Sequence, residues 1–138
     1  MQIQPYLFFD GRCEEALAFY SKAIGAQVQN LVRFKDSPEP PSGASSPGGE
    51  KIMHASMRVG DSLVNASDGE CGGKPDFRGF SLVVDTRDDD EAERSFHALL
   101  EGGGDVAMPL ARTFFASRFG MLRDRFGVHW MVMSPPRR

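Results

Sequence analysis

Hydrophobic and polar positions follow the same order twice along this chain. A short apolar run, Tyr6 to Phe9, ends at Asp10 and is followed by a stretch with helical spacing. A second apolar run ends at Asp85 and leads into another helical stretch, which begins near Asp88. Segments with the period of β-strands follow each helix. A repeat of half a domain predicts two modules that share one sheet and hold a ligand site between them.

The hydrophobic spacing predicts one helix and four strands in each module. The first helix, at residues 12–24, places Ala16, Phe19 and Tyr20 on one apolar face. The strands predicted in the first module cover 3–9, 26–34, 51–59 and 62–67, and those of the second cover 80–84, 105–110, 116–122 and 128–133, around a helix at 88–100. Polar segments rich in Pro, Ser and Gly interrupt this order at 37–49 and 69–78.

These elements predict an α+β fold. We expect two βαβββ modules that form a cupped mixed sheet, with the helices on its outer face. The expected organisation is a single domain over residues 1–138, with module 1 at about 3–68, a linker at 69–78 and module 2 at about 79–134.

Alternation within the strands separates a polar face from an apolar face in the first module. Ala55 and Met57 should face the helix, because they alternate with polar neighbours. The polar residues that share the opposite face are His54, Ser56, Arg58, Asn65 and Ser67. We therefore predict that these five residues line a ligand pocket.

His54 is the strongest candidate for chemistry in this group. Imidazole titrates near neutral pH, so His54 can act as a general acid or base, with Arg58 as an anion partner. A purely structural role, in which His54 bonds to a neighbouring strand or to Asp68, fits the sequence equally well.

Phe115 and Met131 are the candidate apolar contacts to a ligand. Phe115 belongs to a group with Phe114 and Trp130 that would form an aromatic wall for a planar molecule, although aromatic residues at strand spacing also build plain cores. Met131 suits an adaptable apolar cavity and suits core filling equally well.

Two features that suggest reactivity have plainer explanations. Cys13 lies at the first turn of the first helix, but no His or Lys adjoins it in the sequence, so we expect an inert thiol. The acidic run from Asp88 to Glu91 begins the second helix, where its charge suits the positive end of the helix dipole. We therefore expect a solvated helical turn there and no metal site.

The composition of the chain argues against two classes of partner, nucleic acids and membranes. A net charge of −3 leaves no basic stripe for phosphates, so we expect no nucleic acid partner. No apolar stretch approaches the roughly 20 residues that span a bilayer, and the start of the chain lacks a signal-peptide pattern, so we expect no membrane partner. Two widely separated cysteines in 138 residues favour reduced thiols and a cytoplasmic location.

Several strings spread over the chain resemble a known family. They are Pro5-Tyr6-Leu7-Phe8-Phe9, Ile52-Met53-His54-Ala55, Met108-Pro109-Leu110 and Asp124-Arg125-Phe126-Gly127-Val128-His129-Trp130. The chain resembles the PhnB-like branch of the vicinal oxygen chelate superfamily, which includes glyoxalases, bleomycin-resistance proteins and extradiol dioxygenases. The resemblance implies a paired βαβββ fold and a homodimer. In metal-using members it also implies a divalent ion held by His, Glu or Gln from four strands.

The positions implied for metal ligands depart from that pattern. They fall on Pro5 or Gln4, on Asn65, on residues 79–81 and on Met131. Pro and Met do not bind hard or borderline cations, and Asn is a weak neutral ligand. We therefore expect no metal site and no cofactor. The methyltransferase label often attached to this branch also lacks support, because the sequence has no Gly-rich turn of a doubly wound nucleotide-binding fold.

Three functions remain open from the sequence. The first is a dimeric protein that binds a small molecule in its cavity, without a metal, with His54 as the acid or base of any catalysis. The second is a metal-dependent lyase, isomerase or dioxygenase of the same superfamily, with ligands such as Gln4 and His54. The third is a resistance-type protein that sequesters a small molecule without turnover. The sequence does not decide whether the chain is an enzyme.

Overall fold

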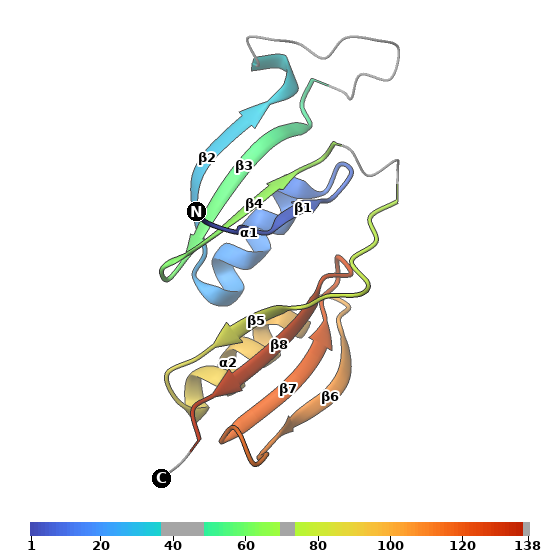
Figure 1. Cartoon of the computed structure of the whole chain (residues 1–138). Helices are drawn as coiled ribbons and strands as arrows, with labels where there is room; N and C mark the ends of the chain where they lie inside the picture. Colours follow the sequence, from blue (N-terminus) through green and yellow to red (C-terminus); the bar gives the residue numbers. More distant parts are fainter. Residues whose placement is uncertain (37–48, 70–73, 137–138) are drawn as a thin grey trace. The chain divides into compact units, whose positions relative to one another are not determined.

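The chain forms two compact units, each with the order βαβββ. The computed structural model describes residues 1–36, 49–69 and 74–136, and the units are Met1–Pro75 and Asp76–Arg138. Figure 1 shows a four-stranded sheet and a long helix in each unit. Most of the loop predicted at 37–49 and part of the linker predicted at 69–78 lie outside the described residues.

The first unit contains a mixed sheet with strand order β1-β4-β3-β2. Its elements are β1 (Tyr6–Phe8), α1 (Cys13–Ile24), β2 (Gln27–Arg33), the short 3-10 helix η1 (Phe34–Asp36), β3 (Ile52–Val59) and β4 (Ser62–Ser67). β1 runs parallel to β4, while β4–β3 and β3–β2 are antiparallel pairs. The first strand is shorter than predicted, since Ile3 lies outside it and is 97% exposed.

The second unit repeats this arrangement with strand order β5-β8-β7-β6. Its elements are β5 (Leu82–Asp85), α2 (Asp89–Leu100), β6 (Asp105–Ala111), β7 (Arg118–Arg123) and β8 (His129–Ser134). The parallel pair is β5–β8, the counterpart of β1–β4. The α+β fold of two βαβββ modules is confirmed. The repeat led us to expect one shared sheet, whereas the strand pairing builds two four-stranded sheets, one in each module.

Helix α1 packs on its sheet through the apolar face that the sequence predicts. Ala16, Leu17 and Tyr20 are buried, and Met57 of β3 is buried on the helix side of the sheet. The helix ends at Gly25, whose φ of 71° places it in the left-handed region. Glycine adopts this conformation without a Cβ clash, so the chain can turn sharply into β2.

Helix α2 lies very close to β7 at Gly120. A Cβ atom at this position would come within 2.8 Å of Cε2 of Phe96 and 3.1 Å of Cδ2 of Leu110. Ala92, Phe96 and Leu99 form the buried face of α2. The missing side chain at Gly120 therefore makes room for the helix on the second sheet.

One buried carboxylate joins three parts of the first unit. Asp68 follows β4 and is 4% exposed. Its Oδ1 accepts hydrogen bonds from the backbone N–H groups of Gly11 at 2.6 Å and Cys13 at 2.9 Å, and its Oδ2 accepts one from Ile52 at 2.8 Å. The β1–α1 turn, the first turn of α1 and the start of β3 are thereby tied to the end of β4.

A second buried carboxylate shapes the turn between β7 and β8. Asp124 is 2% exposed. Its Oδ1 accepts from the backbone N–H groups of Phe126 at 2.8 Å and Val128 at 3.1 Å, while its Oδ2 accepts from Nε1 of Trp130 at 2.8 Å. The carboxylate satisfies turn donors that would otherwise be buried without partners.

We expect the substitution Asp124→Asn to destabilise the second unit by about 2–3 kcal/mol. If the new amide oxygen accepts the hydrogen bonds of the turn, the amide NH₂ group faces the indole N–H of Trp130. Two hydrogen-bond donors then face each other without an acceptor. Trp130 is the single tryptophan of the chain, so its fluorescence during urea unfolding reports this change directly. The control Asp105→Asn removes an exposed pair with Arg123 at 2.8 Å and should cost less than about 1 kcal/mol. Equal losses in the two variants would contradict the assigned role of Asp124.

Candidate functional site

The polar residues predicted in the first unit share the face of its sheet opposite α1, which we call the open face. Ser56 of β3 pairs with Asn65 of β4, and Asn65 pairs with Tyr6 of β1. His54 and Arg58 lie two positions to either side of Ser56, so alternation places them on the same face. Their role as ligand contacts stays a prediction.

The hydroxyl of Tyr6 lies 2.9 Å from Nδ1 of His54. The centroids of the two rings are 5.6 Å apart, and Phe8 stacks on Tyr6 at 5.0 Å. β1 and β3 flank β4, so this hydrogen bond crosses β4 on the open face. His54 therefore bonds to another strand, whereas the carboxylate of Asp68 binds the backbone N–H groups described above.

Two buried hydroxyl groups line the open face beside this pair. Ser67 is 2% exposed, and its Oγ accepts a hydrogen bond from the backbone N–H of Gly69 at 3.3 Å. Ser56 is 4% exposed, and its Oγ accepts from Nδ2 of Asn30 at 3.4 Å. Hydroxyl groups held in this way offer fixed donors and acceptors at the floor of the face.

Asn65 lies opposite Ser56 in the middle of the row, and Arg58 lies at its exposed end. Nδ2 of Asn65 donates to Oε1 of Gln4 at 3.0 Å. Arg58 is exposed, and its cross-strand partner is Leu63. The predicted group is thus an extended row along β3 with His54 at one end and Arg58 at the other.

Tyr6 is a candidate site residue that sequence reasoning missed. It belongs to the family-like string at the start of the chain, and alternation with the buried Leu7 places it on the open face. That alternation was the available signal. Partial burial raises the pKa of Tyr6, and a hydrogen bond with Ser67 opposes the rise. The phenol is therefore protonated at neutral pH and can donate to His54.

Phe115 and Met131 belong to the second unit. Met131 of β8 pairs with Met121 of β7, which pairs with Met108 of β6, so three methionines form a row across that sheet. The ring of Phe115 lies 5.0 Å from that of Phe119. The predicted polar contacts and apolar contacts therefore lie in different units.

Of the two roles considered for Trp130, an aromatic wall and a plain core, the structure supports the core. Trp130 is 3% exposed, and it alternates with Met131, so it lies on the helix side of β8. Its indole N–H is held by Asp124. Phe115 instead contacts Phe114 at 5.2 Å between ring centroids. Trp130 is a core residue.

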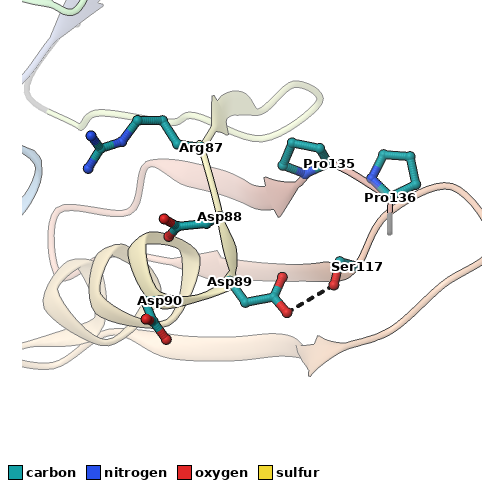
Figure 2. A pocket seen from close by; sticks show the side chains of 7 residues that line it. All are labelled: Arg87, Asp88, Asp89, Asp90, Ser117, Pro135 and Pro136. Carbon is teal, nitrogen blue, oxygen red and sulfur yellow. Dashed lines mark hydrogen bonds between the residues drawn. The ribbon is translucent and has the colours of Figure 1, made fainter. Parts of the chain in front are cut away.

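A hollow of about 390 Å³ opens at the start of α2, as Figure 2 shows. Asp88 caps the helix by accepting from the backbone N–H of Glu91 at 2.8 Å. Asp89 accepts hydrogen bonds from Ser117 at 2.9 Å and Ser134 at 2.7 Å. The hollow is lined by Arg87, Asp88, Asp89, Asp90, Ser117, Pro135 and Pro136. It contains none of the predicted site residues, and its acidic residues serve the start of the helix.

Comparison with known proteins decides the family. Residues 1–133 match the model of a family described as 3-demethylubiquinone-9 3-methyltransferase. The chain belongs to this family. It is also 35% identical over 140 residues to protein YjdN of Escherichia coli strain K12, in an alignment that covers 96% of this chain and 94% of YjdN.

Solved structures support the same assignment. Protein PA1353 from Pseudomonas aeruginosa is 43% identical, with a TM-score of 0.85 and 98% of each chain covered. The PhnB protein from Bacillus cereus is 25% identical, with a TM-score of 0.78 and coverage of 97% of this chain and 99% of its own. A glyoxylase/bleomycin resistance protein/dioxygenase domain from Frankia sp. EAN1pec, 11% identical with a TM-score of 0.65, shares the fold alone over 99% of this chain and 93% of its own. The resemblance to PhnB-like proteins is confirmed, and the fold is that of the glyoxylase/bleomycin resistance protein/dioxygenase domain.

Among the residues that the structure describes, no helix is long and apolar enough to cross a membrane.

The donor atoms on the open face do not fit the divalent metal site of the metal-using superfamily members. Oε1 of Gln4 accepts from Asn65, and Nδ1 of His54 is bonded to Tyr6. Within 1–36, 49–69 and 74–136, no three His, Cys, Asp or Glu side chains cluster closely enough to hold an ion. The thioether of Met131, at another implied position, is a poor ligand for hard cations. We therefore derive no step through a metal.

Cys13 has the properties of an unreactive thiol. Its side chain is fully buried at the first turn of α1. Burial raises the pKa of Cys13 to about 12, with smaller contributions from the negative charges of Asp68 and Glu14. The helix dipole, which favours a thiolate at this position, is outweighed.

We expect iodoacetamide to alkylate Cys13 in the unfolded chain and not in the folded chain at about pH 8, as checked by peptide mass spectrometry. The variant Cys71→Ser isolates the signal of Cys13. Because folding raises this pKa, the unfolded thiol ionises first as pH rises above about 8.5. The folded state should therefore lose stability between that pH and about 12. Alkylation of native Cys13 at the rate of the unfolded chain would show that the thiol is accessible.

Proposed function

We propose that this chain is a dimeric small-molecule-binding protein whose ligand lies on the open face of the first unit. The observation that carries this proposal is the Tyr6–His54 hydrogen bond of 2.9 Å beside two buried serine hydroxyls. A small number of convergent polar groups is the usual means by which a small-molecule site fixes and orients its ligand. The apolar face opposite them holds the fold, so these side chains are free for binding.

The spacing of the polar residues favours an extended ligand. His54 and Arg58 are four residues apart on β3, which separates their backbones by about 13 Å. A ligand that contacts both needs an anionic group near Arg58 and a polar group near His54. Ser56 and Asn65 lie between them and would contact the middle of the molecule.

Any catalysis on this face would proceed without a metal and would involve His54. Methyl transfer, the activity in the family description, is not carried to this chain. The described strands form two mixed four-stranded sheets, whereas the common nucleotide-type cofactor site belongs to a doubly wound parallel sheet.

The exposed apolar residues favour the homodimer. Phe114 is 98% exposed, Val83 54% and Phe80 47% in the single chain. Large exposed apolar side chains suit an interface with another molecule, and a second copy is the partner that family membership suggests. Light scattering should give twice the mass of one 15.2 kDa chain. The mass of a single chain would refute the dimer.

We expect small organic anions that stabilise the wild-type protein in a thermal-shift screen to bind the variants His54→Gln and Arg58→Gln roughly tenfold more weakly, a loss of about 1.4 kcal/mol each. Each variant removes a hydrogen-bonding or charged group from the open face and leaves the core intact. The matched controls are His97→Gln and Arg94→Gln, which change exposed residues of α2. Equal affinity in all four variants would place the ligand elsewhere.

A further inference from the structure

The contact between Tyr6 and His54 has a preferred direction. The hydroxyl of Tyr6 lies 2.9 Å from Nδ1 of His54, so one of the two groups donates and the other accepts. A phenol is a stronger hydrogen-bond donor than acceptor, and an unprotonated imidazole nitrogen is a strong acceptor. The arrangement in which Tyr6 donates is therefore the stronger of the two.

This direction fixes the protonation of the imidazole ring. With Tyr6 as the donor, its hydrogen is directed at Nδ1 of His54, 2.9 Å away. An imidazole nitrogen that accepts a hydrogen bond carries no proton. In neutral His54 the proton must then lie on Nε2.

We propose that Tyr6 is a positioning residue that holds His54 in the tautomer with its proton on Nε2. His54 then presents an N–H group to the open face, and its basic nitrogen is occupied by Tyr6. It can donate a hydrogen bond to a ligand and cannot accept a proton from one in this state.

The tautomer of His54 determines the class of ligand that the open face can bind, and this consequence rests on the proposed function. The atom that meets His54 must be a hydrogen-bond acceptor, such as a carbonyl or carboxylate oxygen. An ammonium or other donor group at that position would leave two donors facing each other. Together with Arg58 at the other end of the row, the face offers donors at both ends.

The tautomer can be measured without any ligand, by imidazole ¹⁵N NMR of the full chain at about pH 8.5, two units above the ordinary imidazole pKa. The three histidines are assigned with the variants His54→Gln, His97→Gln and His129→Gln. We expect the Nε2 of His54 to be protonated and its Nδ1 to show the shift of a hydrogen-bonded acceptor. In Tyr6→Phe that shift should be lost, and His54 should adopt the tautomer ratio of a free imidazole.

A matched comparison separates the hydrogen bonds from general packing. Ser56→Ala, which removes a buried hydroxyl bonded to Asn30, should leave the resonance in place. A proton on Nδ1 in the wild type, or an identical Nδ1 resonance in wild type and Tyr6→Phe, would overturn the assignment. Either result would leave ligand binding on this face to be judged separately by the thermal-shift comparison.

Discussion

The carboxylate of Asp68 is the constraint on which the first unit depends. It accepts hydrogen bonds from the backbone N–H groups of Gly11, Cys13 and Ile52 at 2.6–2.9 Å. The start of α1 and the start of β3 are therefore held at the same point. His54 lies two residues beyond Ile52, and Tyr6 lies on the strand that leads into the β1–α1 turn. The position of β3 relative to β1 therefore determines whether these two side chains meet. Their hydrogen bond across β4 follows from an anchor that touches neither of them.

The two units share the βαβββ order but differ in their side chains. In both, a carboxylate joins the end of a strand to the start of the helix, but in the first unit the carboxylate follows the strand and in the second it belongs to the helix. Asp68 reaches from the strand end to α1, whereas Asp89 reaches from α2 to the hydroxyls of Ser117 and Ser134. The open face of the first sheet is polar, and the corresponding face of the second sheet carries methionines and phenylalanine. The repeated βαβββ order thus supplies a common frame, and the two halves differ in the side chains that this frame carries on the face opposite the helix.

Much of this arrangement follows from strand alternation, which is a local property. The pattern around Ala55 and Met57 predicted that Ser56 and Asn65 share a face, and the strand pairing places them opposite each other. The Tyr6–His54 bond could not be predicted in this way. It joins residues 48 positions apart and depends on the strand order β1-β4-β3-β2, which periodicity does not contain. The hydrogen-bond partners of Asp68 and Trp130 could not be predicted for a related reason, since a buried carboxylate and an indole N–H find partners set by turn geometry.

The central claim is that the polar open face of the first unit is where this protein contacts a small molecule. Crystals soaked with a library of small carboxylates and other acceptor-rich fragments test it most directly, because they show the binding position without any assumption about turnover. We expect fragments within hydrogen-bond distance of Nε2 of His54, with extended anions reaching towards Arg58. Fragments that bind reproducibly elsewhere, for example in the hollow between Arg87 and Pro136, while the open face stays empty, would contradict it.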